Sequence, residues 1–249
     1  PFASGADYAK KVFIRRNPKL AAKIAKADEK LDIEELRAFE EKMYGDIWNK
    51  EDYLNWMYEN LFAIKSMMTE TASIYVHIDW HIGHYIKILM DEVFGEDKFR
   101  REIIWDNAAL SGLKTKAPNW IKAHDTILYY SLSDEKIFNK QSQPHRKEYL
   151  DRFDKTDKDG RKYFDGRGEK LYLEDVIKKG KAVGDVWYDI MSFQQIPTSS
   201  ENVDYATQKP TALLERIIKA SSNEGMMIAD FFGGSGVTAK TANDLKRNF

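Results

Sequence analysis

The chain has 249 residues, of which 43% are hydrophobic and 32% charged, a balance typical of globular proteins and not of disordered ones. It contains no cysteine, which excludes disulfides and thiolate metal sites and favours a cytoplasmic protein. The formal net charge is −1, yet residues 98–185 carry 20 basic and 15 acidic side chains, a balance of +5. That basic segment fits a polyanionic partner and equally a solvated surface. No membrane span is expected, because no stretch approaches ~20 apolar residues.

Helical and strand patterns alternate in the first half of the chain. Residues 18–43 are rich in Ala, Leu, Lys and Glu and predict a helix, within an N-terminal helical segment over 10–70. Strand, helix and strand following one another within about 35 residues are typical of a doubly wound α/β sheet. The elements predicted here are helices over 51–69 and 82–94, and strands over 73–79, 101–105 and 126–131.

Regular patterns are interrupted over residues 132–184, where charge, glycine and isolated aromatic residues dominate. This composition predicts a small inserted unit with weak hairpins around 162–164 and 170–173. Beyond it, the spacing predicts a helix over 210–222, a strand over 226–231 and a last helix that begins near Val237.

A glycine-rich turn follows the predicted strand over 226–231. The strand ends in Asp230, and Gly233, Gly234 and Gly236 come directly after it. Glycines let a backbone approach a ligand closely, and open α/β sheets bind ligands at the carboxyl ends of their strands. The acid suits a ligand with an amine or hydroxyls. The turn lacks the Gly-Lys-Ser/Thr ending of a phosphate loop and a strict G-x-G-x-x-G, and a plain connection remains the alternative.

Lys209 and Pro210 precede the helix predicted over 210–222. Pro210 suits a first helical turn, where its missing N–H costs nothing. Lys209 adds positive charge to a helix N-terminus that already favours anions. Taken alone, the pair is typical of helix capping.

These motifs together resemble the S-adenosylmethionine-dependent amino-methylating DNA methyltransferases, and more narrowly their permuted β group, which includes type III restriction-modification methylases. The resemblance covers most of the chain outside residues 10–50 and 134–180. Phe231 stands where the family usually has Pro, and Val237 where it usually has Thr, which we expect to adjust cofactor affinity without abolishing binding. The motifs that carry the resemblance are Thr207-Gln208-Lys209-Pro210, Ser221-Ser222-Asn223-x-Gly225 and Asp230-x-Phe232-x-Gly234-Ser235-Gly236.

The resemblance implies one Rossmann-like three-layer α/β methyltransferase domain over 1–249, with a mixed sheet, the N-terminal helical extension and the inserted recognition region. It implies methyl transfer from S-adenosyl-L-methionine to the exocyclic amine of a flipped base in double-stranded DNA. Adenine N6 is favoured over cytosine N4. A restriction subunit and a second copy of the chain are further partners that the sequence leaves open.

Cofactor contacts also follow from the resemblance. Asp230 is expected to contact the methionine part of the cofactor, and Lys209 to lie near its carboxylate. Phe232 is expected either beside the cofactor or in the core. The residues assigned to the cofactor are Lys209, Pro210, Asp230, Phe232, Gly234, Ser235 and Gly236.

The catalytic residues assigned by the resemblance are Pro1 and Phe2. They match the second half of the family tetrapeptide Asp/Asn/Ser-Pro-Pro-Tyr/Phe, in which Phe2 stacks on the base and Pro1 stiffens the turn. The polar residue that accepts a hydrogen bond from the amine would then precede the chain, and a strand with an acid for the ribose would follow Phe249. We therefore expect the chain by itself to methylate weakly or not at all.

DNA contacts are expected in the basic segment 132–184, where the family keeps its target-recognition region, although a solvated face explains many of the same charges. His77, His81 and His84 lie near Asp79, but no further ligand completes a metal cage, so no metal is expected. Asp79 is expected to N-cap the helix over 82–94.

The alternatives to a DNA methyltransferase are another Rossmann-type nucleotide-dependent enzyme and a DNA-binding or subunit-docking fragment without chemistry. The residues assigned to DNA are Arg146, Lys147, Lys158, Arg161, Lys162, Lys178 and Lys179.

Overall fold

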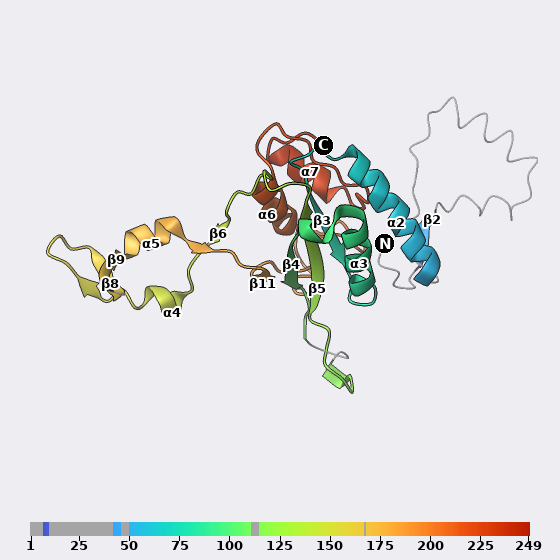
Figure 1. The fold of residues 1–249 in the computed structure, drawn as a ribbon. Coiled ribbons are helices and arrows are strands. Elements are labelled where there is room, and N and C mark those ends of the chain that lie inside the picture. Colours follow the sequence, from blue (N-terminus) through green and yellow to red (C-terminus); the bar gives the residue numbers. More distant parts are fainter. Residues whose placement is uncertain (1–6, 10–41, 46–49, 111–114, 167) are drawn as a thin grey trace, which may run out of the picture.

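The computed structural model describes residues 7–9, 42–45, 50–110, 115–166 and 168–249 (Figure 1). Its centre is a mixed four-stranded sheet with helices on both faces, so the predicted three-layer α/β fold is confirmed. The strands follow the order β11–β4–β5–β3. Their bounds are Ser73–Ile78 for β3, Phe99–Asp106 for β4, His124–Ser131 for β5 and Val186–Trp187 for β11.

The central strand β5 sets the direction of its neighbours. Both β3 and β4 pair with it antiparallel, so these two run parallel to each other and end at the same edge of the sheet. The crossover between them is α3 (Gly83–Phe94), followed by the short 3-10 helix η2 (Glu96–Lys98). β11 pairs parallel with β4. We call the edge where β3, β4 and β11 end the carboxyl edge.

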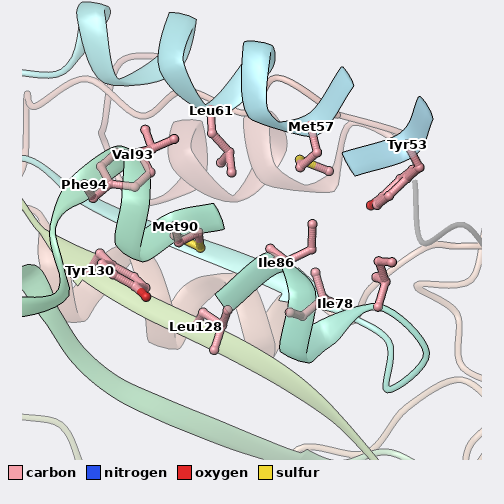
Figure 2. Close-up of a cluster of buried hydrophobic side chains, with 11 residues drawn as sticks. Tyr53, Met57, Leu61, Ile78, Ile86, Met90, Val93, Phe94, Leu128 and Tyr130 are labelled. Carbon is pink, nitrogen blue, oxygen red and sulfur yellow. The ribbon is translucent and has the colours of Figure 1, made fainter. Parts of the chain in front are cut away.

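Alternation along β5 buries both of its faces. Leu128 and Tyr130 point to one side, and Ile127 and Tyr129 to the other, as the two-residue period of a strand requires. On the first side they meet α3 and α2 (Lys50–Met67). Figure 2 shows the α2 side chains directed toward α3 and the sheet. That layer buries Tyr53, Met57 and Leu61 of α2 at helical spacing against Ile86, Met90 and Val93 of α3.

The other face of the sheet is covered by α6 (Thr211–Ser221). Leu213 of this helix is buried in one cluster with Trp105, Ile127 and Trp187. The indole Nε1 of Trp105 donates to the carbonyl of Ile190 at 2.8 Å, which satisfies the polar atom of a buried aromatic side chain. This bond ties the segment after β11 to the end of β4.

Two predicted elements are wrong where the structure describes them. Residues 226–231 form no strand: their only ladder contact is a parallel bridge between Met227 and Asn248, within the described residues. The segment ending at Phe249 reaches it through two bonds of Asn248, with Ile228 N donating to Asn248 O at 2.8 Å and Asn248 N donating to Met226 O at 2.9 Å, and these form a single bridge. The predicted helix over 18–43 lies mostly outside the described residues, and its last two residues belong to strand β2 (Lys42–Gly45), which pairs with β1 (Asp7–Ala9).

A small unit projects from the body between β6 (Ser142–Gln143) and β10 (Lys181–Ala182), which pair antiparallel as its stem (Figure 1). Phe153 is buried in it, with the rings of Tyr149 and Phe164 within 6.0 Å between centroids. Residues 132–141 were predicted to belong to the inserted unit, but they run along the body. There, Asn139 N donates to Ala220 O at 2.7 Å. The elements of the unit are α4 (Lys147–Leu150), β7 (Lys155–Thr156), β8 (Lys162–Gly166), β9 (Glu169–Tyr172) and α5 (Leu173–Lys179).

Candidate cofactor site and carboxyl edge

The glycine turn leads from residue 230 into α7 (Val237–Asp244). Gly234 and Gly236 have φ angles of +51° and +78°, a region that other residues rarely adopt. Gly236 N donates to Gly233 O at 2.7 Å, and Gly236 O accepts from Lys240 N at 3.0 Å, which starts the helix. The turn therefore requires glycine for its backbone conformation, and it presents a helix N-terminus beside Asp230.

The Asp230 carboxylate organises this turn. One oxygen accepts from Phe232 N at 3.0 Å, and the other accepts from the Thr238 hydroxyl at 2.5 Å. The side chain is exposed, and each carboxylate oxygen can accept a further hydrogen bond. Asp230 is thus held in place while still able to bind an amine or a hydroxyl. The sequence did not predict the bond from Thr238 to Asp230. The position of Thr238 in the first turn of the helix after Gly236 is the pattern that would have indicated it.

A hollow of about 300 Å³ lies against the turn. Among the described residues, the buried hydroxyl of Ser235 makes no hydrogen bond, but Ser235 does not line this hollow. The glycine backbone and the exposed acid fit a ligand that carries an amine or hydroxyls. The hollow is lined by Met227, Ile228, Ala229, Asp230, Phe231, Gly233, Gly236, Thr238, Ala239 and Phe249.

Phe232 is 44% exposed, so the core role left open for it is wrong. Its ring lies 5.7 Å from the ring of Trp56 in α2, measured between centroids. The glycine turn therefore contacts α2 through an aromatic pair in which the Phe232 ring stays partly exposed.

Lys209 and Pro210 lie next to the carboxyl edge. Pro210 is the N-cap of α6 and so precedes the first helical turn in which it was predicted. The Lys209 ammonium donates to Thr207 O at 3.1 Å. Burial lowers the pKa of Lys209, an effect that the carboxylate of Asp125 opposes. The structure thus places the charge of Lys209 near Asp125, at the start of β5.

A polar cluster at the carboxyl edge went unrecognised in the sequence. Asp125 accepts from Asn107 Nδ2 at 2.6 Å, pairs with Lys122 Nζ at 2.7 Å, and is joined to His77 Nε2 by a 3.0 Å hydrogen bond. Lys122 also bonds Asp79 at 2.7 Å. Burial raises the pKa of Asp125, but the bonds from His77 and Lys122 outweigh it, so that the pKa lies well below its ordinary value. Burial lowers the pKa of His77, which keeps its ring neutral near pH 7.

One expectation about this edge changes with the geometry. Asp79 does not cap α3, whose N-cap is Ile82 without a side-chain hydrogen bond; Asp79 bonds His81 and Lys122 instead. His77 and His81 each bind a carboxylate. Within the described residues, no group of three or more metal-ligating side chains could hold an ion.

A family model described as DNA methylase matches residues 2–249 of the chain. The chain belongs to this family. The prediction of an S-adenosylmethionine-dependent, amino-methylating DNA methyltransferase is thereby confirmed at the level of the family. The described part of the methylase contains no helix with the length and apolar character that crossing a membrane requires.

The relatives of the chain include a type II methyltransferase and a subunit of a type III restriction-modification enzyme. The chain is 30% identical over 158 residues to the type II methyltransferase M1.MboII of Moraxella bovis, covering 61% of the chain and 56% of that relative. It is 23% identical over 268 residues to the StyLTI Mod subunit of a type III restriction-modification enzyme of Salmonella typhimurium, covering 84% of the chain and 40% of that subunit. The chain thus spans about half the length of the curated relatives it matches.

Two solved structures share the fold of the methylase. The M1.HpyAVI–SAM complex matches with a TM-score of 0.51 and 17% identity, over 80% of this chain and 76% of that one. The cytosine-N4-specific PvuII DNA methyltransferase matches with a TM-score of 0.53 and 13% identity, over 83% and 68%.

The residues assigned to DNA in this methylase all lie in the projecting unit or at its stem. Arg161 stacks over Tyr172 at 3.9 Å and pairs with Asp175, so it stabilises the unit from within. Arg146 lies over the ring of Tyr188 at 5.0 Å, and its hydrogen bond to the phenol lowers the pKa of Tyr188. The other assigned side chains are exposed: Lys147, Lys158, Lys162, Lys178 and Lys179. Pro1 and Phe2, assigned to catalysis, lie outside the described residues.

Proposed function

We propose that this chain carries the catalytic domain of an S-adenosylmethionine-dependent methyltransferase that methylates the N6 amine of adenine in double-stranded DNA. The observation that carries the proposal is the glycine turn with its fixed, exposed Asp230, in a chain that a DNA methylase model matches from end to end. The cofactor supplies the methyl group from its sulfonium. The chain's residues bind and orient both reactants, because holding two reacting groups in line is the main requirement of such a transfer.

The glycine turn is the part that would hold the cofactor. Asp230 accepts hydrogen bonds from the amine of the methionine part, while Gly234 and Gly236 leave room for it and Phe232 lies beside it. Ser235 is the nearby hydroxyl. Lys209, before Pro210, offers positive charge for the carboxylate, and its ammonium donates to Thr207 O at 3.1 Å.

The reacting base is proposed to be flipped out and stacked on Phe2, with Pro1 stiffening that turn. Adenine is the proposed target rather than cytosine. The PvuII methyltransferase, which shares the fold, is cytosine-N4-specific, so the fold does not distinguish adenine N6 from cytosine N4. The methylated nucleoside has to be identified to distinguish them.

The proposal predicts the modified nucleoside. The protein expressed from its full reading frame, incubated with unmethylated DNA and a tritiated methyl donor, is expected to place the label in N6-methyldeoxyadenosine after digestion to nucleosides. Label in N4-methyldeoxycytidine would overturn the choice of adenine, and no incorporation into any unmethylated DNA would overturn the proposed function.

The projecting unit is proposed to bind the DNA target through its exposed lysines. Replacing both Lys178 and Lys179 by alanine should reduce the slope of log K against log salt by about 1.8, because each phosphate contact contributes about 0.9. Fluorescence anisotropy of a labelled duplex at several salt concentrations measures this. Lys240→Ala is the matched control, since this exposed lysine lies on α7 and pairs with Asp244. An unchanged slope in the double variant would remove these two lysines from the interface.

A further inference from the structure

The connection between β4 and β5 presents the most exposed large apolar side chain of the described residues. Trp120 is 97% exposed, whereas the tryptophans of the core, Trp105 and Trp187, are buried. A fully exposed indole leaves its whole ring surface available to a binding partner. Figure 1 shows the two arms of this connection, residues 107–110 and 115–123, extending beyond the sheet.

The place of this loop is the second observation. It leaves the carboxyl edge, where β3 and β4 end on either side of β5 and where open α/β sheets bind their ligands. Trp80 follows β3 at the same edge, is 58% exposed and stacks on His81 with ring centroids 3.8 Å apart. Two exposed indoles thus belong to the side of the sheet where the family chemistry is expected.

The root of the loop is fixed by hydrogen bonds. Asn107 N donates to Ala123 O at 3.1 Å, which closes the two arms. Lys122 pairs with Asp79 and Asp125 at 2.7 Å each, and Ser192 donates to Asn107 O at 2.5 Å. Trp120 N donates to Asn119 Oδ1 at 2.7 Å, which shapes the tip. The loop that carries the Trp120 indole is therefore held in place at its root.

The charge of the loop indicates which kind of partner binds it. Lys116, four residues before Trp120, is exposed, and the described residues of 107–124 include no acidic side chain. Lys122 is already paired with Asp79 and Asp125, so Lys116 supplies the positive charge near the indole. An aromatic ring near a lysine matches a nucleic-acid strand, which combines flat apolar bases with phosphates. An apolar protein surface would use the indole but not the positive charge.

We propose that Trp120 stacks on a nucleobase of the bound DNA, close to the base that is methylated. This inference rests on the proposed function and adds to it a DNA contact outside the projecting unit. The indole covers a base face exposed when the helix opens, and Lys116 neutralises a nearby phosphate.

Trp120→Ala tests the contact. Its affinity for DNA should fall about tenfold, because the stacking of one base on the indole is lost. The slope of log K against log salt should stay unchanged, since no phosphate contact is removed. Trp120→Phe should retain most of the affinity. Phe62→Ala, which removes a 60% exposed ring from α2, is the matched control and should leave binding as in the wild type.

The outcomes separate the inference from the proposed function. Wild-type protein that binds no DNA and transfers no methyl group overturns both. Wild-type activity with equal DNA affinity in Trp120→Ala overturns the stacking contact alone. A reduced salt slope in Trp120→Ala would show a phosphate contact instead, and a change in the oligomeric state of the DNA-free variant would show a protein partner; either result overturns the proposal.

Discussion

Replacing Asp230 by alanine is expected to weaken the binding of S-adenosylmethionine by about 100-fold. The carboxylate is proposed to accept a hydrogen bond from the cofactor amine, and bonds between charged groups contribute on the order of 1.5–3 kcal/mol. The substitution also removes the acceptor for Phe232 N and for the Thr238 hydroxyl, which together shape the turn. Calorimetric titration of the protein expressed from its full reading frame measures the loss.

Two further variants show whether the charge or the shape of the turn is responsible. Asp230→Asn keeps an acceptor for Phe232 N but has no charge, so an intermediate loss is expected. Asp244→Ala removes an exposed acid from α7, the helix that follows the turn, where it pairs with Lys240, and should bind as the wild type does. Equal affinity in Asp230→Ala and the wild type would contradict the site assignment, and the absence of binding heat in all proteins would contradict the cofactor proposal.

Replacing Asp125 by alanine is expected to lower the free energy of unfolding by about 3 kcal/mol. Removing one member of a buried charge pair costs about 3–5 kcal/mol, and the half-exposed Lys122 places this case at the lower end. His77 and Asn107 would each lose a partner in a largely buried position. Urea unfolding followed by circular dichroism measures the change. Asp134→Ala is the control, because this acid is exposed where it pairs with Arg100 and should cost little.

Acid should weaken the same cluster. The pKa values of His77 and Asp125 are both lowered in the folded protein, so the unfolded chain binds more protons as pH falls. The stability associated with His77 is present above about pH 6.5 and is lost below it, and that of Asp125 is lost below about pH 4. Asp125→Ala should show a smaller loss of stability below pH 4 than the wild type. An identical pH profile in both proteins would contradict this account.

Local periodicity predicted those elements whose burial is repeated along one segment. The apolar residues of α2 and α3 recur every three or four positions, and β5 is apolar on both faces, which reflects its central position. The segment 226–231 looks equally apolar, yet it forms no strand, because a strand depends on a neighbour that the sequence does not identify. Apolar composition predicts that a segment is buried, whereas the pairing of a strand with its neighbour depends on the whole fold.

The glycine turn was predictable because its residues are contiguous. Asp230, Gly234 and Gly236 act through a backbone conformation that local sequence dictates. The carboxyl-edge cluster was not predictable, since His77 and Asp125 are separated by 48 positions and meet only through the register of β3 and β5. Arg161 illustrates the same difficulty for charge, because its use inside the projecting unit depends on Tyr172 and Asp175 being brought to it.

The two-stranded stem of the projecting unit has an evolutionary consequence. Ser142 pairs with Ala182 and Gln143 with Lys181, so the chain returns to the body beside the point at which it left. The unit is therefore joined to the body at the same two neighbouring points whatever sequence lies between them. Insertions of other lengths fit there without altering the sheet. Recombination at the stem would therefore exchange the whole unit while the glycine turn is inherited unchanged.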